Sequence, residues 1–418
     1  MRLVVIGGEA AGLSAAARAR RLDPSLAITV LEKGGEISYG ACGLPFLVDG
    51  RARSAEQLLV YSPEYFRKER NIEIRTNTGA LAIAHARREV QIEGGGRVPY
   101  DRLVIATGAR AAAGGIALHT LEDGERMKRL IDERKPRRAL IIGAGYIGLE
   151  LADALRRLGM RVTVVEESPY VLNREDEALA ALVKAHLDRF GVELLLNTRS
   201  GGENTGDLVI SATGLRPNVE LAAEAGIELG RTGAIRVTDR METNIPGIYA
   251  AGDCAETVHL VSGRPAWIPL GTTANKMGRV AGANAAGRRE SFPGVVGTSI
   301  VGVCGLAIGL CGLSSPEARR AGFQPVSARV TAGGKARYLG GRPIHLELIA
   351  DRGTSRLLGG TAAGEDGVHA AINTIATALH AAMRLEDVEH LDLAYAPPFG
   401  AVWDPVLVAA QQLRRQLG

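Results

Sequence analysis

The segment around Cys42 places a thiol where it could do chemistry. It reads ISYGACGLPF from Ile37 to Phe46, and Gly40 and Gly43 lie close to the cysteine. A thiolate attacks a disulfide sulfur and forms a mixed disulfide. The chain has four cysteines, and no two of them form a Cys-x-x-Cys pair. We therefore expect the substrate, and not the protein, to supply the second sulfur.

The remaining cysteines and the histidines carry no comparable signal. Cys254, Cys304 and Cys311 stand apart from one another and are expected to be small buried apolar residues. The 8 histidines show no metal-ligand spacing. We predict no metal site.

An internal repeat predicts the elements that would bind the electron donors for this thiol. RLVVIGGEAAG (2–12) is followed by AITVLE (27–32), and RALIIGAGYIG (138–148) is followed by RVTVVE (161–166). Each copy is typical of a strand, a glycine-rich turn, a helix and a second strand that ends in Glu. Such a turn brings backbone N–H groups to a pyrophosphate, and the Glu accepts hydrogen bonds from ribose hydroxyls. The repeat predicts two bound dinucleotides.

The two copies differ in their turns. The second has the complete G-x-G-x-x-G, with Gly143, Gly145 and Gly148. In the first, Glu9 takes the middle position, where its side chain has to point away from the phosphates. Glu166 ends the second copy with no Arg immediately after it, and Glu167 adds negative charge. A carboxylate repels the extra phosphate of NADPH, so NADH is the expected nucleotide.

Three further stretches indicate what the first copy binds. They are LVIATG (103–108), SATGLRPN (211–218) and NIPGIYAAGD (244–253). With these motifs the whole chain resembles flavoproteins that have two dinucleotide-binding domains. The resemblance implies FAD in the first unit, with Asp253 on the ribityl hydroxyls. The implied FAD contacts are Gly7, Gly8, Ala11, Gly12, Glu32, Lys33, Ala106, Thr107, Gly108, Gly252 and Asp253. The implied NADH contacts are Gly143, Gly145, Tyr146, Ile147, Gly148, Glu166 and Gly214, with Tyr146 covering the flavin until the nicotinamide arrives.

The absence of two catalytic residues indicates which branch of these flavoproteins the chain resembles. Leu47 stands where glutathione-reductase-like enzymes have a second cysteine, and Ala382 stands where they have a catalytic histidine. The chain is similar instead to the single-cysteine branch, which contains coenzyme A-disulfide, CoA-persulfide and polysulfide reductases, NADH oxidase and NADH peroxidase. Oxidase and peroxidase members carry a histidine in the first glycine-rich turn, whereas this chain has Ala10.

The C-terminal region resembles the same branch. HLDLAYAPPFGAVWDP (390–405) is similar to a segment whose tyrosine reaches the active site of the other subunit, and Tyr395 matches that tyrosine. Tyr338 aligns less closely with a second such residue. Without the resemblance, a tyrosine beside two prolines is explained equally well as an anchor of a surface loop and as a catalytic residue. The resemblance implies a homodimer, with Cys42, Tyr395 and Tyr338 as catalytic residues.

The first helix offers positions for coenzyme A. By resemblance the contacts are Ser14, Arg18, Arg21 and Ser38, although arginines three residues apart are also typical of a solvated helix face. Relatives commonly have Asn before the cysteine, where this chain has Ala41. That difference leaves open which disulfide or persulfide is preferred.

Composition sets the remaining limits. The net charge is +4, from 50 basic and 46 acidic residues with no basic block, so we expect no nucleic-acid partner. The start of the chain enters a strand directly, which predicts a cytoplasmic protein. Residues 291–316 carry no charge, but their glycines and β-branched residues favour buried strands over a membrane span.

The predicted architecture is α/β, with two Rossmann-like domains and a C-terminal α+β dimerisation domain. We assign 1–108 and 234–290 to FAD, 109–233 to NADH and 291–418 to dimerisation; the NADH domain looks trimmed at 197–206. The leading hypothesis is an NADH-dependent reductase of CoA-disulfide or CoA-persulfide, a small thiol-derived substrate. The alternatives are an NADH oxidase, in which Cys42 is oxidised to a sulfenate, and a flavin redox sensor or electron donor to a protein.

Overall fold

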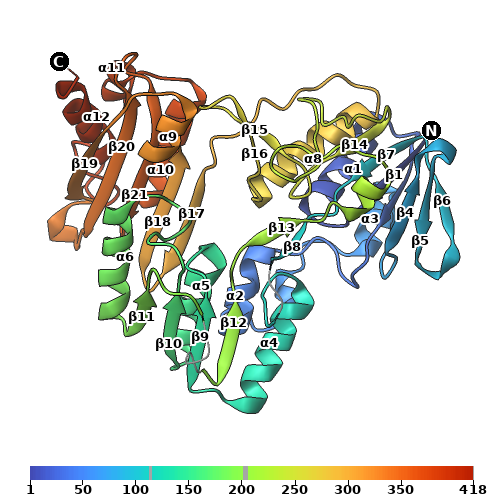
Figure 1. Cartoon of the computed structure of the whole chain (residues 1–418), viewed down its shortest axis with the longest axis horizontal. Coiled ribbons are helices and arrows are strands. Elements are labelled where there is room, and N and C mark those ends of the chain that lie inside the picture. The colour runs from blue at the N-terminus through green and yellow to red at the C-terminus, as the bar shows by residue number, and fades with distance from the viewer. Residues whose placement is uncertain (113–114, 201–205, 418) are drawn as a thin grey trace.

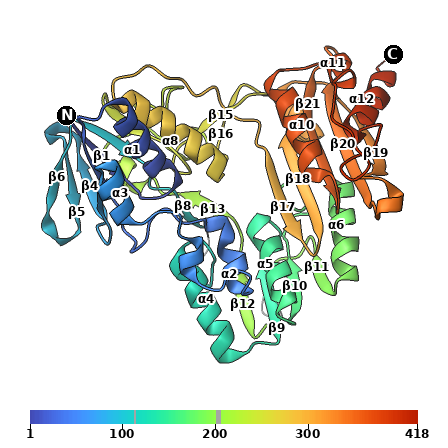
Figure 2. The ribbon, with the colours of Figure 1, turned by 180° about the vertical axis from the view of Figure 1, so that it is seen from behind.

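The computed structural model of the protein describes residues 1–112, 115–200 and 206–417. Figure 1 shows a first α/β unit that contains the N-terminus, a C-terminal unit at the opposite side, and a second α/β unit that joins them below. Figure 2 shows the same arrangement from behind. Residues 201–205, within the segment that looked trimmed, lie outside the described ranges.

The first unit is built on a parallel sheet in the order β14-β7-β1-β2-β3. Its strands are short apolar runs, as expected for strands covered on both faces. They are β1 (Arg2–Ile6), β2 (Ala27–Leu31), β3 (Glu73–Arg75), β7 (Arg102–Ile105) and β14 (Ile248–Ala250). Beside this sheet lies an antiparallel one of β4 (Ala80–Ala84), β5 (Glu89–Ile92) and β6 (Arg97–Pro99), with α3 (Pro63–Arg70) and α7 (Glu220–Glu224) nearby.

Two helices of the first unit pack unusually closely. They are α1 (Ala10–Leu22) and α8 (Gly271–Ala285). A Cβ at Gly278 would lie 2.1 Å from the carbonyl oxygen of Ala11, and a Cβ at Gly282 would lie 2.1 Å from that of Ala15. Because no side chain fits there, glycine at both positions is what allows α8 to hold α1 against the sheet.

The second unit repeats the design. Its parallel sheet has the order β11-β10-β9-β12, from β9 (Arg138–Ile142), β10 (Arg161–Val165), β11 (Val192–Leu195) and β12 (Leu208–Ser211). Its helices are α4 (Leu121–Arg134), α5 (Tyr146–Arg157) and α6 (Glu177–Arg189). An antiparallel pair of β8 (Ala109–Ala111) and β13 (Leu215–Pro217) connects the two units. The two Rossmann-like units predicted from the repeat are confirmed.

The C-terminal unit is an antiparallel sheet in the order β17-β18-β21-β20-β19. The strands are β17 (Ser299–Val303), β18 (Leu306–Gly312), β19 (Pro325–Gly333), β20 (Pro343–Asp351) and β21 (Leu357–Gly364). The accompanying helices are α9 (Ser315–Ala321), α10 (Val368–His380), α11 (Leu385–Glu389) and α12 (Pro405–Arg415). The predicted α+β unit is confirmed.

The uncharged segment 291–316 forms strands β17 and β18, of which β18 is buried as predicted and β17 is buried on one face only. Val301, Val303 and Ile308 pack with the core of the second unit, whereas Cys311 packs with the helices of the C-terminal unit. β18 is therefore buried along most of its length, whereas β17 is an edge strand in which Val301 and Val303 are buried and Ile300 is 43% exposed. No helix in the described ranges is long and apolar enough to cross a membrane.

Candidate active site

The two glycine-rich turns have the same backbone geometry. Gly7 and Gly143 both have positive φ, +111° and +108°. A Cβ at Gly12 would lie 1.9 Å from the Gly7 carbonyl oxygen, and a Cβ at Gly148 would lie 2.0 Å from that of Gly143. Each turn thus requires glycine at its first and last positions, and each leads into a helix whose first N–H groups are available to a phosphate.

The glutamates that end the second strands are also equivalent. Glu32 accepts hydrogen bonds from Gly8 N at 2.6 Å and from Gly34 N at 2.6 Å. Glu166 accepts from Ala144 N at 2.8 Å and from Ser168 N at 2.9 Å. These contacts fix each carboxylate beside its turn and leave further lone pairs to accept ribose hydroxyls. Both turns therefore fit an adenine dinucleotide.

The charge beside Glu166 differs from the expectation. Glu167 was expected to add to the repulsion of a 2′-phosphate. Instead, Arg199 from the segment after β11 donates to Glu167, with Nε and Oε1 2.6 Å apart. The guanidinium offsets part of the charge of Glu167 in a pair whose side chains are both exposed.

The other residues expected at FAD follow neighbouring strands. Lys33 follows β2, Ala106–Gly108 follow β7, and Gly252 and Asp253 follow β14. Because β2, β7 and β14 are parallel to β1, all these residues come to the edge where the Gly7 turn lies. Ala11 meets this edge from α1, and a Cβ at Gly252 would lie 2.7 Å from the Ala11 Cβ. Burial raises the pKa of Asp253 to about 6.

Ile147 and Gly214 are placed in the same way in the second unit. Ile147 lies in the first turn of α5, and Gly214 follows β12, which pairs with β9. The structure thus brings together the residues predicted for each nucleotide, one set at each sheet.

Glu9 reaches away from its turn towards the segment that leads to Cys42. Burial, and then the carboxylate of Glu32, raises the pKa of Glu9 to about 8, whereas the backbone N–H groups of Tyr39 and Ser38 lower it. Its Oε1 is buried without a hydrogen-bond partner among the described residues. The raised pKa favours the neutral form of Glu9 at pH 7, which limits the charge that it adds to the turn.

Cys42 lies in a short 3-10 turn, Ala41–Gly43, directly before α2 (Leu44–Val48). It is exposed, whereas the other three cysteines are buried as predicted. Desolvation by the surrounding protein raises the pKa of the Cys42 thiol, and the carboxylates of Glu150 and Asp253 raise it further. No cation in the described part of the chain offsets these effects.

Glu150 was not predicted from the sequence. It lies on α5 one helical turn after Tyr146, in the second unit. Burial raises the pKa of Glu150 to about 7, with Arg51 acting against the increase and Asp153 adding to it. The available signal was the i, i+4 spacing from Tyr146, which places both side chains on one helix face.

The residues predicted for coenzyme A have partners within the chain. Ser14 Oγ donates to Asn275 Oδ1 at 2.7 Å, and Arg18 pairs with Glu290 at 2.5 Å. Arg21 is exposed, and Ser38 has a positive φ of 52° in the segment before Cys42. Ligand binding through Ser14 or Arg18 would require these partners to share or release the side chains.

Tyr338 and Tyr395 belong to the C-terminal unit, whereas Cys42 lies directly before α2. Tyr395 is in the irregular segment between α11 and α12. Figures 1 and 2 show both helices at the outer side of the C-terminal unit, whereas α2 lies beside the second unit. Tyr338 is 78% exposed and Tyr395 is 51% exposed. Both hydroxyl-bearing side chains are therefore accessible on the surface of the C-terminal unit.

The comparisons agree with this geometry. The family model described as pyridine nucleotide-disulphide oxidoreductase matches residues 1–278, and that of its dimerisation domain matches residues 298–405.

Within the described residues, no group of three or more His, Cys, Asp or Glu side chains could hold a metal ion.

Similar proteins cover essentially the whole chain. An NAD(P)H coenzyme A polysulfide/persulfide reductase from Pyrococcus horikoshii is 36% identical, over 99% of this chain and 98% of the relative. An NADH oxidase from Methanocaldococcus jannaschii is 32% identical, over 100% of this chain and 99% of the relative. The solved structure of an NAD-dependent persulfide reductase from A. fulgidus has a TM-score of 0.95 and 38% identity, over 100% of this chain and 83% of that one. The chain belongs to the pyridine nucleotide-disulphide oxidoreductase family.

Proposed function

We propose that the protein is a FAD-dependent oxidoreductase that uses NADH to reduce a CoA-disulfide or CoA-persulfide through Cys42. The observation that carries this proposal is that Cys42 is the exposed cysteine, while the other three are buried. A lone accessible thiol can form a redox-active disulfide only with an external sulfur. The coenzyme A persulfide reductase from P. horikoshii supports the substrate class.

The residues at the two sheets would hold the cofactors. FAD would be held by the turn from Gly7 to Gly12, by Glu32 and by Asp253, and NADH by the turn from Gly143 to Gly148 and by Glu166. When both are bound, NADH and FAD supply the two electrons that reduce a disulfide on Cys42. Glu166 is the basis for proposing NADH over NADPH.

Cys42 would act as the nucleophile. Its thiolate attacks one sulfur of CoA-disulfide, forms a Cys42–S–S–CoA bond and expels CoA thiolate. With a persulfide the expelled group is hydrosulfide. Two electrons and a proton then regenerate the Cys42 thiolate and release the second CoA as a thiol.

The partner subunit would supply the acid. Tyr395, Phe399 and Trp403 are large exposed aromatic side chains in one segment, 51%, 82% and 64% exposed. Such a surface is typical of one covered by another subunit. We propose a homodimer in which the partner's Tyr395, together with the partner's Tyr338, approaches Cys42 and protonates the departing sulfur.

Coenzyme A would bind along α1. Arg18 and Arg21 offer two positive charges for its phosphates, and Ser14 and Ser38 offer hydroxyl groups. The salt bridge from Arg18 to Glu290 would have to open or rearrange on binding.

Anaerobic stopped-flow spectroscopy tests the proposal. The NADH-reduced protein is mixed with CoA-disulfide, with CoA-persulfide or with oxygenated buffer, and flavin absorbance is followed. Fast reoxidation by a CoA species, abolished in Cys42→Ser, is the expected result. Reoxidation by oxygen alone would favour the activity named for the M. jannaschii relative, an NADH oxidase. No fast reoxidation by any of the three would favour a redox sensor or a protein partner.

A further inference from the structure

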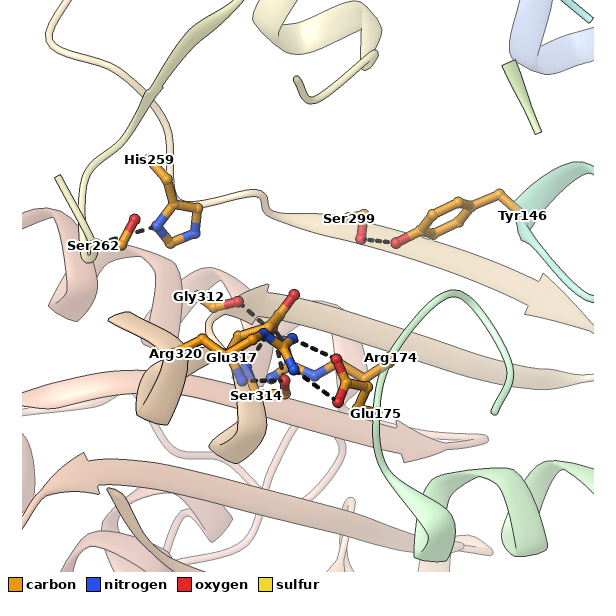
Figure 3. A network of polar contacts seen from close by, with 10 residues as sticks. All are labelled: Tyr146, Arg174, Glu175, His259, Ser262, Ser299, Gly312, Ser314, Glu317 and Arg320. Carbon is orange, nitrogen blue, oxygen red and sulfur yellow. Dashed lines mark hydrogen bonds and ion pairs between the residues drawn. The ribbon is translucent and has the colours of Figure 1, made fainter. Parts of the chain in front are cut away.

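We infer that Ser299 is a positioning residue for Tyr146: its hydroxyl holds the tyrosine ring across the path of the nicotinamide, and this hydrogen bond must break before NADH can react. Tyr146 Oη and Ser299 Oγ lie 2.5 Å apart (Figure 3). The two residues are 153 positions apart in the sequence and belong to different units. The inference rests on the proposed use of FAD and NADH, but not on the proposed acceptor.

The position of Tyr146 follows from its place in α5. Tyr146 is the first residue of this helix and comes directly after Gly145, the N-cap. Its main chain is therefore part of the turn proposed to bind the NADH pyrophosphate. The ring extends from this turn to β17, as Figure 3 shows, and burial raises the pKa of its hydroxyl. A nicotinamide leaving the turn towards the flavin would meet this ring.

Ser299 is a fixed point for the tyrosine hydroxyl. It begins β17 and pairs with Leu310 of β18, so its main chain is held in the C-terminal sheet. That sheet is itself joined to the second unit by polar contacts. Arg174 donates to the Gly312 carbonyl oxygen at 3.0 Å, and Asp153 Oδ1 accepts from Cys304 N at 3.0 Å.

Further ion pairs hold the same two units together. Arg329 of β19 pairs with Asp176 at 2.7 Å, and Arg320 of α9 pairs with Glu175. Figure 3 shows the contacts of Arg174 and Glu175 below the Tyr146–Ser299 pair. Because the units are fixed against each other, a rotation of the Tyr146 side chain has to break its bond to Ser299.

The hydrogen bond sets a measurable barrier to nucleotide entry. The net free energy of one hydrogen bond corresponds to about a two- to ten-fold change in an equilibrium constant. Loss of the bond is expected to strengthen NADH binding by that factor, because the ring then leaves its position more readily. The electron-transfer step after binding is expected to keep its rate.

The test uses the FAD-loaded protein without any sulfur acceptor. Ser299→Ala, Tyr146→Phe, the double variant and Ser299→Thr are compared with the wild type. Ser262→Ala is the control, since Ser262 lies beside His259 and does not contact Tyr146. Anaerobic flavin reduction is followed at increasing NADH, and the NAD+ dissociation constant is measured by isothermal titration calorimetry.

We expect Ser299→Ala and Tyr146→Phe each to lower the half-saturating NADH concentration and the NAD+ dissociation constant about two- to ten-fold. The double variant should show no further decrease, and Ser299→Thr should restore wild-type values because it keeps the hydroxyl. Unchanged or weaker NAD+ binding in Ser299→Ala would overturn the inference, as would fully additive effects. Because no CoA species is present, failure of the proposed substrate does not affect this result.

Discussion

Glu150 and Cys42 belong to different α/β units, yet the carboxylate of Glu150 raises the pKa of the Cys42 thiol. Glu150 itself has a pKa raised to about 7, so its negative charge develops through the neutral pH range. The second unit thereby contributes a charge that acts, with desolvation, to raise the pKa of a thiol carried by the first. This electrostatic relationship can be measured without any substrate.

Glu150→Gln is expected to increase the reactivity of Cys42. Removal of the negative charge lowers the thiol pKa, which increases the thiolate fraction and speeds alkylation by iodoacetamide several-fold at pH 8. The difference from wild type should shrink below pH 7, where Glu150 is protonated in the wild type. Alkylation reports Cys42 because the other cysteines are buried.

Glu177→Gln is the matched control for this measurement, since Glu177 is an exposed residue on α6. It should alkylate at the wild-type rate at every pH. Equal rates for Glu150→Gln and wild type at pH 8 would contradict the account.

Mixed dimers test the proposed role of Tyr395. Homodimers of Cys42→Ser should be inactive, and homodimers of Tyr395→Phe should lose roughly a hundred-fold in turnover with CoA-disulfide. If Tyr395 serves the partner's Cys42, a mixed dimer contains one intact site. Equal mixing of dissociated subunits should then recover about a quarter of the wild-type activity, because half of the dimers are mixed. A mixture no more active than the Tyr395→Phe protein alone would show that Tyr395 does not act at the partner's Cys42.

Glu166→Gln is expected to relax the preference for NADH. The amide oxygen can still accept a hydrogen bond, but the charge that repels a 2′-phosphate is gone. The ratio of kcat/KM for NADPH to that for NADH should rise about ten-fold or more. Glu177→Gln is the control and should leave this ratio unchanged, because Glu177 is an exposed carboxylate on α6. An equal effect of the two substitutions would show that Glu166 does not carry the discrimination.

Gly282→Ala is expected to destabilise the first unit. The new Cβ would lie 2.1 Å from the Ala15 carbonyl oxygen, so α1 and α8 must separate. Overpacking of this kind costs about 1–3 kcal/mol, and contact with backbone places this variant at the upper end. Gly271→Ala on the same helix has open space and should be neutral or stabilising. Thermal denaturation at saturating FAD checks both variants. Equal melting temperatures for Gly282→Ala and Gly271→Ala would contradict the packing argument.

The sequence was sufficient for those features that depend on neighbouring residues. The two strand–turn–helix repeats, the glycine turns and the strands within 291–316 all follow from local pattern, and the structure contains them. The contacts between units were not predictable, because they join residues far apart in the chain. Tyr146 meets Ser299 across 153 positions, and Arg174 reaches the Gly312 carbonyl oxygen across 138.

Single side chains show the same limit. The position of Glu9 in its turn predicted that the carboxyl points away from the phosphates, but not that it faces the N–H groups of Ser38 and Tyr39. Glu150 lies one turn after a residue already assigned to the site, yet nothing local indicates its effect on Cys42. Its effect depends on how α5 of the second unit approaches the Cys42 segment of the first.

The central claim is that Cys42 forms its redox-active disulfide with coenzyme A. The most direct measurement is intact and peptide mass spectrometry of the protein after mixing with CoA-disulfide in the absence of NADH. We predict a mass increase of one coenzyme A per chain, located on the peptide that contains Cys42 and removed by adding NADH. An unmodified Cys42, or a sulfenic acid there with no coenzyme A attached, would contradict the claim.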